Sequence, residues 1–479
     1  MESLSRPPRP RPPVAWLLLI ALLLPLLAAC GAGSPNGPAN APISGGSTAA
    51  TAPAPGESMG TAATAAPANA PIAAAEAPTA ASAGEPSAAA AAPTAASLDA
   101  GGAPSGDTAG IAAPAIAARP SPVVPQRIED QQQFVPLKAG EVDDNADFAS
   151  YLTYLSNYGG RPALPVDVTG RYILTVVNDK RQPVLDARVR LFDGDQQIFE
   201  GRTYAGGKTI ILPRTLGVSG NQPLLMLVEK GNSAIQAQLQ FGQESAQTIV
   251  LPGAEALPQT TRLDVLFLLD ATGSMADEIA QIQSTIVSIA DRIDQIKPRP
   301  ELRFGLVTYR DHTDEYTSHL DDFTPDVDAF RQILLGVSAG GGGDIPEALN
   351  EGLYMAIKGP QWDTDAVRLI FLVADAPPHL DYPDPDYLQG VHSAVARGIK
   401  IYTIAASNSD EQAEYVFRQL AQQTLAHFIF LTYQPGQESG PPGDTTTHNV
   451  DPQNFTVERL DDLVVQVVQH ELAQASGSS

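Results

Sequence analysis

The chain has 479 residues, enough for two or three domains, and carries a net charge of −25 with a single cysteine. Residues 1–126 account for only −2 of this charge, so the rest is acidic enough to repel nucleic acid and anionic lipid head groups, which excludes nucleic-acid binding. One cysteine also excludes an intrachain disulfide.

Residues 1–30 have the pattern of a secretory signal. Three arginines precede an apolar stretch from Val14 to Ala29, which is shorter than the roughly 20 residues that span a bilayer. The segment Leu-Ala-Ala-Cys ending at Cys30 resembles the lipobox of bacterial lipoproteins. This resemblance implies lipidation of Cys30 and an extracytoplasmic, membrane-anchored location, at the cell surface or in the periplasm. The alternative is an ordinary signal peptide or anchor with an incidental cysteine.

Residues 31–126 are rich in Ala, Pro, Gly, Ser and Thr and contain few large apolar side chains. Such a segment cannot bury a core, so we expect a disordered linker that acts as a tether without a binding role.

Residues 127–160 form a short acidic and helical segment. Asp143, Asn145 and Asp147 alternate as in a calcium loop, but Phe148 replaces the required Gly and Tyr154 replaces the final Glu. We therefore expect the start of a solvated amphipathic helix and no EF-hand.

Residues 161–255 change to a period of two. Ile235, Ala237, Leu239 and Phe241 alternate with polar neighbours, and Gly- and Asn-containing turns interrupt the pattern. Seven short strands at this spacing predict a small all-β sandwich. The stretch 172–190 resembles the regulatory modules found beside carboxypeptidases. We found no catalytic constellation there, which favours a spacer or docking role.

The most informative stretch runs from Leu263 to Ser274. Apolar residues from 265 to 269 predict a strand buried on both faces, and the apolar spacing from Met275 to Ile296 predicts a helix. Asp270, Thr272 and Ser274 lie on the turn between them, at the edge of an α/β sheet where ligands bind. One carboxylate and two hydroxyls at alternate positions can present three hard oxygens to Mg²⁺, Mn²⁺ or Ca²⁺.

The remaining chain alternates between strands and helices, which predicts an α/β domain over residues 256–475 with a mostly parallel sheet covered on both faces. We expect strands at 303–309, 317–323, 367–374, 399–406 and 428–433, with 317–323 as an antiparallel edge. Helices are expected at 326–335, 345–357, 387–396, 411–422 and 457–472, and a surface loop at 434–453.

Two further loops carry acidic residues. Four glycines precede Asp344, and Asp375 follows the apolar strand at 367–374. Together with Asp-x-Thr-Gly-Ser at 270–274, this resembles the metal-ion-dependent adhesion site of the von Willebrand factor type A family. The motifs at 309–312, 341–348 and 375–379 resemble a subgroup found in hemicentins and beside some atypical kinases.

This resemblance covers about residues 261–472 and implies a Rossmann-like domain with a central, mostly parallel six-stranded sheet. It also implies a divalent cation, Mg²⁺ before Mn²⁺ or Ca²⁺, held by side chains from three loops: Asp270, Thr272, Ser274, Asp344 and Asp375.

Two of these positions depart from the family pattern. Thr272 replaces the commoner Ser and keeps the hydroxyl, whereas Asp344 stands where a Thr is expected. A carboxylate at Asp344 would offset the charge of the cation and weaken its demand for an acidic ligand from a partner. Alternatively, Asp344 and Glu347 form a capping box, and Asp270 and Ser274 serve only as strand-end and cap residues.

The sequence predicts a non-enzymatic, lipid-anchored adhesion protein that binds a protein or other macromolecule through a cation and touches the membrane only through its lipid. One alternative is a surface scaffold with a vestigial metal site. Another is a metal-assisted hydrolase that uses His312 or His379, although no hydrolase or phosphate-loop motif is present.

Overall fold

Residues 136–218, 222–242, 245–255, 260–382, 384–407, 409–432, 448, 450 and 455–477 are described by the computed structural model of this chain. The signal segment with Cys30 and the linker at 31–126 lie outside these residues. None of the described helices is long and apolar enough to cross a membrane.

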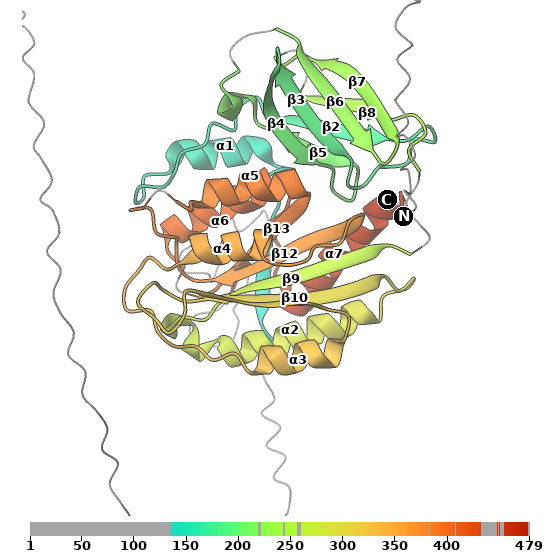
Figure 1. Cartoon of the computed structure of the whole chain (residues 1–479). Helices are drawn as coiled ribbons and strands as arrows, with labels where there is room; N and C mark the ends of the chain where they lie inside the picture. The colour runs from blue at the N-terminus through green and yellow to red at the C-terminus, as the bar shows by residue number, and fades with distance from the viewer. Residues whose placement is uncertain are drawn as a thin grey trace, which may run out of the picture. The chain divides into compact units, whose positions relative to one another are not determined.

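One eight-stranded sheet forms the centre of the α/β domain, in the order β11-β10-β9-β12-β13-β14-β1-β15. Figure 1 labels its inner strands β10, β9, β12 and β13. Strands β10, β9, β12, β13 and β14 are parallel, and β11 lies antiparallel at one edge, as predicted. The bounds are β1 Lys138–Val142, β9 Arg262–Asp270, β10 Glu301–Tyr309, β11 Ser318–Thr324, β12 Ala366–Ala374, β13 Ile399–Ala405, β14 Phe428–Leu431 and β15 Glu458–Arg459.

The predicted number of six strands was wrong. Strand β1, from the segment before the small β sheets, pairs antiparallel with β14, and β15 pairs with the other side of β1. The six strands of the prediction are therefore extended by two, because the chain at 138–142 supplies backbone partners to a strand almost 290 residues further on.

Each face of the sheet packs against its own set of helices. Along β9, Leu263, Val265 and Phe267 point into one core and Leu266 and Leu268 into the other, as the alternation of a strand requires. Helices α2 (Ile279–Asp294), α3 (Val327–Leu335) and α7 (Leu460–Ser476) belong to the first core. Helices α4 (Leu349–Lys358), α5 (Tyr387–Arg397) and α6 (Glu411–Gln423) belong to the second (Figure 1).

Aspartates begin three of these helices. The side chains of Asp326, Asp386 and Asp410 accept hydrogen bonds from backbone N–H groups in the first turns of α3, α5 and α6. Such caps satisfy donors that have no partner within the helix. The predicted helices at 326–335, 387–396 and 411–422 are thereby confirmed to within a residue or two.

Two other helix predictions were wrong at their starts. The helix expected from Met275 begins as the 3-10 turn η2 (Gly273–Asp277), and α2 follows it. The helix expected at 345–357 starts only at Leu349, after Ala348, which makes no side-chain cap. The capping box suggested for Asp344 and Glu347 therefore does not form. Most of the loop expected at 434–453 lies outside the described residues.

His427 holds β1 in the sheet. Its Nδ1 lies 2.6 Å from Glu141 Oε1 and its Nε2 lies 3.3 Å from Asp143 Oδ2. Burial alone would lower the pKa of His427, but the two carboxylates outweigh burial and raise the pKa to about 9. Helix α1 (Phe148–Asn157) follows β1 and is capped by Asp147, which confirms the predicted helix start.

Residues 172–250 form two small sheets with the orders β5-β2-β8 and β4-β3-β6-β7. Their seven strands are β2 Tyr172–Val177, β3 Arg188–Asp193, β4 Gln196–Arg202, β5 Lys208–Ile211, β6 Leu224–Lys230, β7 Ser233–Leu239 and β8 Ala246–Val250, with the 3-10 turn η1 at Pro213–Leu216. Side chains from both sheets share one hydrophobic core. Their classification as a sandwich of the carboxypeptidase-regulatory type stays a prediction.

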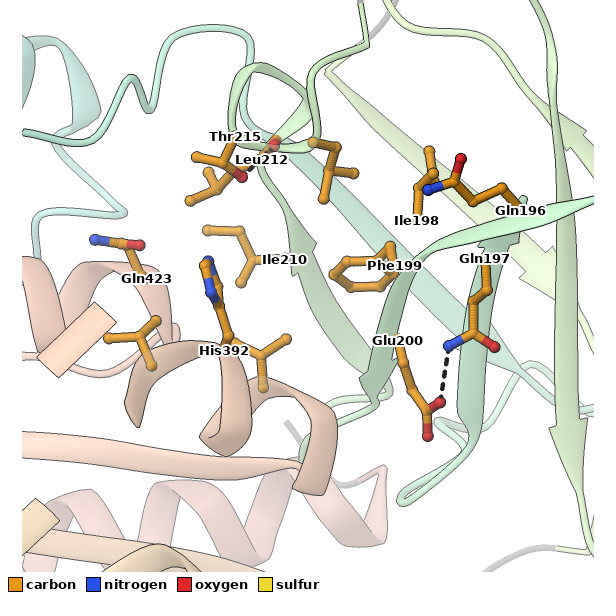
Figure 2. A pocket seen from close by; sticks show the side chains of 13 residues that line it. Gln196, Gln197, Ile198, Phe199, Glu200, Ile210, Leu212, Thr215, His392 and Gln423 are labelled. Carbon is orange, nitrogen blue, oxygen red and sulfur yellow. Dashed lines mark hydrogen bonds between the residues drawn. The ribbon is translucent and has the colours of Figure 1, made fainter. Parts of the chain in front are cut away.

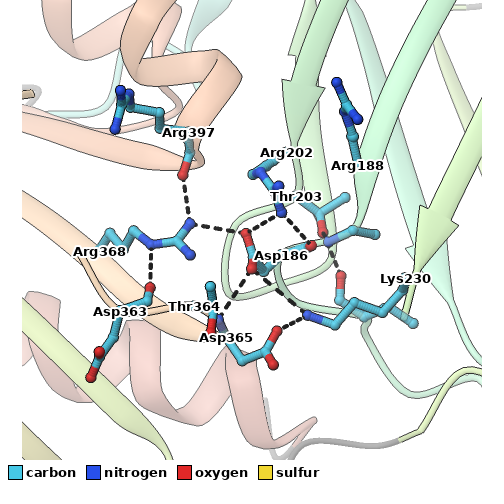
Figure 3. A network of polar contacts seen from close by, with 12 residues as sticks. Asp186, Arg188, Arg202, Thr203, Lys230, Asp363, Thr364, Asp365, Arg368 and Arg397 are labelled. Carbon is cyan, nitrogen blue, oxygen red and sulfur yellow. Dashed lines mark hydrogen bonds and ion pairs between the residues drawn. The ribbon is translucent and has the colours of Figure 1, made fainter. Parts of the chain in front are cut away.

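A polar network joins the small sheets to the α/β domain. The side chain of Asp186 is only 3% exposed, and its Oδ1 lies 2.9 Å from Arg368 Nη1 and 3.0 Å from Arg202 Nη1 (Figure 3). Its Oδ2 accepts a hydrogen bond from the backbone N–H of Asp365 at 3.1 Å, and Lys230 contacts both carboxylates. This network lies at the start of β12, at the end of the sheet opposite Asp270 and Asp375.

A cavity of about 470 Å³ lies between the small sheets and α5 (Figure 2). Phe199, Ile210 and Leu212 line it on one side, and Val391 and His392 of α5 line it on the other. Ile210 and Leu212 share one hydrophobic core with Val391 and Val395 of α5, so the small sheets pack directly on the α/β domain.

Candidate metal centre

The first loop of the candidate site follows β9. Asp270 is fully buried, and its Oδ1 accepts hydrogen bonds from the backbone N–H of Thr272 at 2.9 Å and from Thr272 Oγ1 at 2.7 Å. Ser274 is exposed, and its Oγ lies 3.1 Å from Thr272 Oγ1. The structure thus brings together the three oxygen-bearing side chains that the sequence spacing selected.

Tyr309, at the end of β10, is a member of the site that sequence reasoning missed. The register pairs Tyr309 with Asp270, and its buried hydroxyl donates a hydrogen bond to Asp270 Oδ2 at 3.0 Å. Both carboxylate oxygens of Asp270 are therefore fixed in position. The sequence did contain a signal for Tyr309, because this residue ends a predicted strand and begins the family-like motif at 309–312.

The third loop brings Asp375 to the same edge. Strand β12 runs parallel to β9 with Val373 opposite Leu269, so the residues that follow both strands leave the sheet side by side. Asp375 is 6% exposed. Burial and the negative charge of Asp375 raise the pKa of Asp270 to about 7. Burial and a neighbouring like charge both disfavour the ionised form of a carboxylate.

Backbone hydrogen bonds hold the glycine-rich second loop against the first. Gly340 N–H donates to the carbonyl of Ala271 at 2.9 Å, and Gly273 N–H donates to the carbonyl of Gly341 at 3.0 Å. A Cβ on Gly273 would lie 2.7 Å from that carbonyl oxygen, so no larger residue fits. Gly342 has a φ of 61°, which also favours glycine.

The second loop does not place its acidic residues as the sequence predicted. Asp344 is exposed. Glu347, three residues later, is only 3% exposed. Burial and the charges of Asp270, Asp311 and Asp375 raise the pKa of Glu347 to about 8. The structure thus adds Glu347 to the buried acidic groups at this edge, and the metal role of Asp344 stays a prediction.

The two histidines considered for a hydrolase are bound by other polar side chains. His379 Nε2 lies 3.0 Å from Asp311 Oδ1, and its Nδ1 lies 3.1 Å from Asp381 Oδ1. His312 Nε2 lies 2.7 Å from the hydroxyl of Tyr382. These contacts connect the loops after β10 and β12. They orient the rings toward acids and a phenol, not toward a nucleophile.

The donor set fits a hard divalent cation. Buried carboxylates that repel one another, with hydroxyls beside them, are what Mg²⁺ or Ca²⁺ would neutralise and bind. Glu347 Oε2 is buried without a hydrogen-bond partner, which is the kind of atom that an ion or its water satisfies. Within the described residues, no three His, Cys, Asp or Glu side chains could hold an ion by themselves. Hydroxyls and water would have to complete the coordination.

Comparison with known proteins gives a family for this part of the chain. Residues 264–433 match the family model of the von Willebrand factor A domain. The chain therefore contains a von Willebrand factor A domain, a class of domain that generally mediates protein interactions, is not enzymatic and commonly binds a divalent cation.

Individual relatives match only over part of their length. Alpha-protein kinase vwkA of Dictyostelium discoideum is 31% identical over 127 residues, 26% of this chain and 20% of that protein. A protein named as ariadne-like RING finger protein, from Acanthamoeba polyphaga mimivirus, is 26% identical over 117 residues, 24% of this chain and 11% of that protein. The chain thus spans a fifth or less of these relatives. The solved structure of BatB from Bacteroides thetaiotaomicron, a conserved hypothetical protein, is 12% identical with a TM-score of 0.31 and covers 44% of this chain and 98% of that one.

Proposed function

We propose that this protein is a non-enzymatic adhesion protein that recognises a protein or other macromolecular partner through a divalent cation. The observation that carries the proposal is the convergence of Asp270, Thr272 and Ser274 at the carboxyl edge of the sheet, with Asp375 beside them. Asp270 and the two hydroxyls would hold the ion, and Asp375 would act directly or through water. Asp344 stays a ligand predicted from the sequence.

Each group of the site has a distinct task in this proposal. The bound cation supplies a positive centre to which an oxygen of the partner is attracted. Tyr309 and the backbone N–H of Thr272 orient the carboxylate of Asp270. The glycine-rich loop keeps bulky side chains away from the first loop, so that the partner can approach.

The location of the protein is also part of the proposal. Lipidation of Cys30 would anchor the chain on the extracytoplasmic side of a membrane, and residues 31–126 would tether the binding domain to the anchor. The lipobox-like sequence and the single cysteine support this view. Mass spectrometry of the mature protein tests it, since an unmodified Cys30 would contradict the anchor.

The cation is tested by isothermal titration of the full chain with Mg²⁺, Mn²⁺ and Ca²⁺. We expect the wild type to bind and the Asp270→Ala variant to lose binding, because the remaining donors cannot replace a buried carboxylate. Asp195→Asn, an exposed aspartate in the β3–β4 turn, is the matched control. Equal and negligible binding by the wild type and Asp270→Ala would refute the proposed cation site and leave a scaffold.

A further inference from the structure

Glu347 holds a central place among the three loops. Its backbone N–H donates to the carbonyl of Pro377 at 3.1 Å, and its carbonyl accepts from the N–H of His379 at 3.3 Å. These two bonds tie the end of the second loop to the third loop, so the backbone of Glu347 is fixed at the same edge as Asp375.

The side chain of Glu347 points toward the first loop. A Cβ built on Gly342 would lie 2.7 Å from Glu347 Oε1 and 3.1 Å from Thr272 Cβ. Since both atoms lie that near to one point, they are no more than 5.8 Å apart. The carboxylate of Glu347 therefore lies beside the loop that carries Thr272. Gly342 leaves room for it, because a side chain at this position would collide with it.

None of the structural roles common for a buried glutamate accounts for this position. Glu347 does not cap α4, whose N-cap is Ala348. No ion pair among the described residues involves it, and Arg310, whose backbone carbonyl accepts from Ala348 N–H, pairs with Glu315. Its Oε2 is buried without a hydrogen bond. A buried carboxylate without a counter-charge is costly, so Glu347 either takes up a proton or pairs with a positive group such as a cation.

We propose that Glu347 is the acidic group that the second loop contributes to the cation site, and that it holds a water molecule of the ion's shell. Water must mediate, because no three acidic side chains of the described residues are close enough to share an ion directly. This inference rests on the proposed cation-dependent function. It assigns to Glu347 the place that the sequence pattern gives to Asp344.

The third carboxylate determines the kind of partner that fits. Asp270, Asp375 and Glu347 together carry one negative charge more than a divalent cation neutralises. The loaded site therefore does not attract an acidic side chain of a partner. Asp311 and Asp314 add further negative charge around it. The partner should present a neutral oxygen, such as an amide or hydroxyl, within a neutral or basic surface.

The test compares the cation affinities of full-chain variants by isothermal titration with MgCl₂. Glu347→Gln keeps the shape and removes the charge, and we expect it to weaken Mg²⁺ binding by roughly 10- to 100-fold, as for other groups that act on a metal through its shell. Asp344→Asn removes the same charge from the same loop at an exposed position, and we expect a smaller loss, below about threefold. Asp195→Asn is the control for a lost surface charge.

The same titrations separate failure of this inference from failure of the proposed function. Loss of binding in Asp270→Ala together with unchanged binding in Glu347→Gln would overturn the role of Glu347 and leave the cation site intact. No binding by the wild type would overturn both. Should Glu347→Gln fail to fold, as judged by circular dichroism, Glu347→Asp keeps the charge and should retain more affinity than Glu347→Ala.

Acetate provides a second readout. Loaded wild-type protein should show no change in Mg²⁺ affinity in acetate buffer relative to chloride. Glu347→Gln should gain affinity in acetate, because the loaded site is then neutral and no longer carries the excess negative charge that repels a carboxylate. Tighter Mg²⁺ binding by the wild type in acetate would overturn the inferred preference for a neutral or basic partner.

Discussion

The contact between the small sheets and the α/β domain depends on the charge of Asp186, and the variant Asp186→Asn tests this. Asp186 has a φ of 59°, a conformation that Asn tolerates well, so the substitution adds little backbone strain. It keeps the shape of the side chain and removes its charge. The guanidinium of Arg368, whose side chain is 7% exposed, then remains buried without its carboxylate.

The magnitude follows from this burial. Removing one partner of a buried ion pair typically costs about 3–5 kcal/mol, because the other charge stays in a poorly hydrated place. Arg368 also donates hydrogen bonds to the carbonyls of Asp363 and Arg397, which moderates the loss. We therefore expect a decrease of about 3 kcal/mol in the free energy of unfolding and a fall in Tm of roughly 6 °C.

Urea unfolding of the full chain, followed by tryptophan fluorescence, measures this change. Trp362 lies in the loop that leads to the network, so its emission reports on this part of the molecule. Asp195→Asn is the matched control. A loss for Asp186→Asn within about 0.5 kcal/mol of the control would refute the reasoning. So would a double-mutant cycle with Arg368→Met in which the two losses are simply additive.

Three further predictions concern the sheet and the site. The pKa of His427 is about 9 in the folded protein and 6.5 as its ordinary value, so the charged histidine stabilises the fold by up to ~3 kcal/mol. This stabilisation is complete below pH 6.5 and is lost as the pH rises through 9. The unfolding free energies of wild type and His427→Gln, measured in urea, should therefore converge at pH 9.5, and a difference that grows there would contradict this. Gly342→Ala should destabilise the protein by about 1–2 kcal/mol in thermal melts and weaken Mg²⁺ binding, whereas Gly343→Ala, whose Cβ meets nothing, should do neither. Tyr309→Phe removes only the hydroxyl bound to Asp270, and we expect a loss of about 1–2 kcal/mol by urea unfolding; an unchanged stability would mean that this hydrogen bond contributes nothing.

The sequence was a good guide to the first loop of the site. An apolar run that stops at Asp270 predicts both a buried strand and its end, and the spacing of Thr272 and Ser274 keeps them on one tight turn. Asp375 followed from the same logic, because β12 is as apolar as β9. These inferences needed only local patterns and the rule that parallel strands end at a common edge.

The second loop was less predictable. The sequence pattern selected Asp344 and gave Glu347 only a capping role, whereas the folded chain buries Glu347 and exposes Asp344. That choice depends on where α4 begins and on how the glycines pack against the first loop, neither of which a short motif specifies. Tyr309 escaped notice because a buried aromatic at a strand end ordinarily indicates core packing.

By itself, the sequence determined the alternation of strands and helices, the α/β class of the main domain and the strand end that carries Asp270, because these follow from periodicity and local propensity. Only the tertiary structure decided that β1 and β15 extend the sheet, that Asp186 joins the small sheets to it, and that Glu347 lies beside Thr272. Each of these depends on contacts between segments far apart in the chain. Such contacts form because they lower the free energy of the whole fold through packing and ion pairing. A short local sequence pattern does not contain this information.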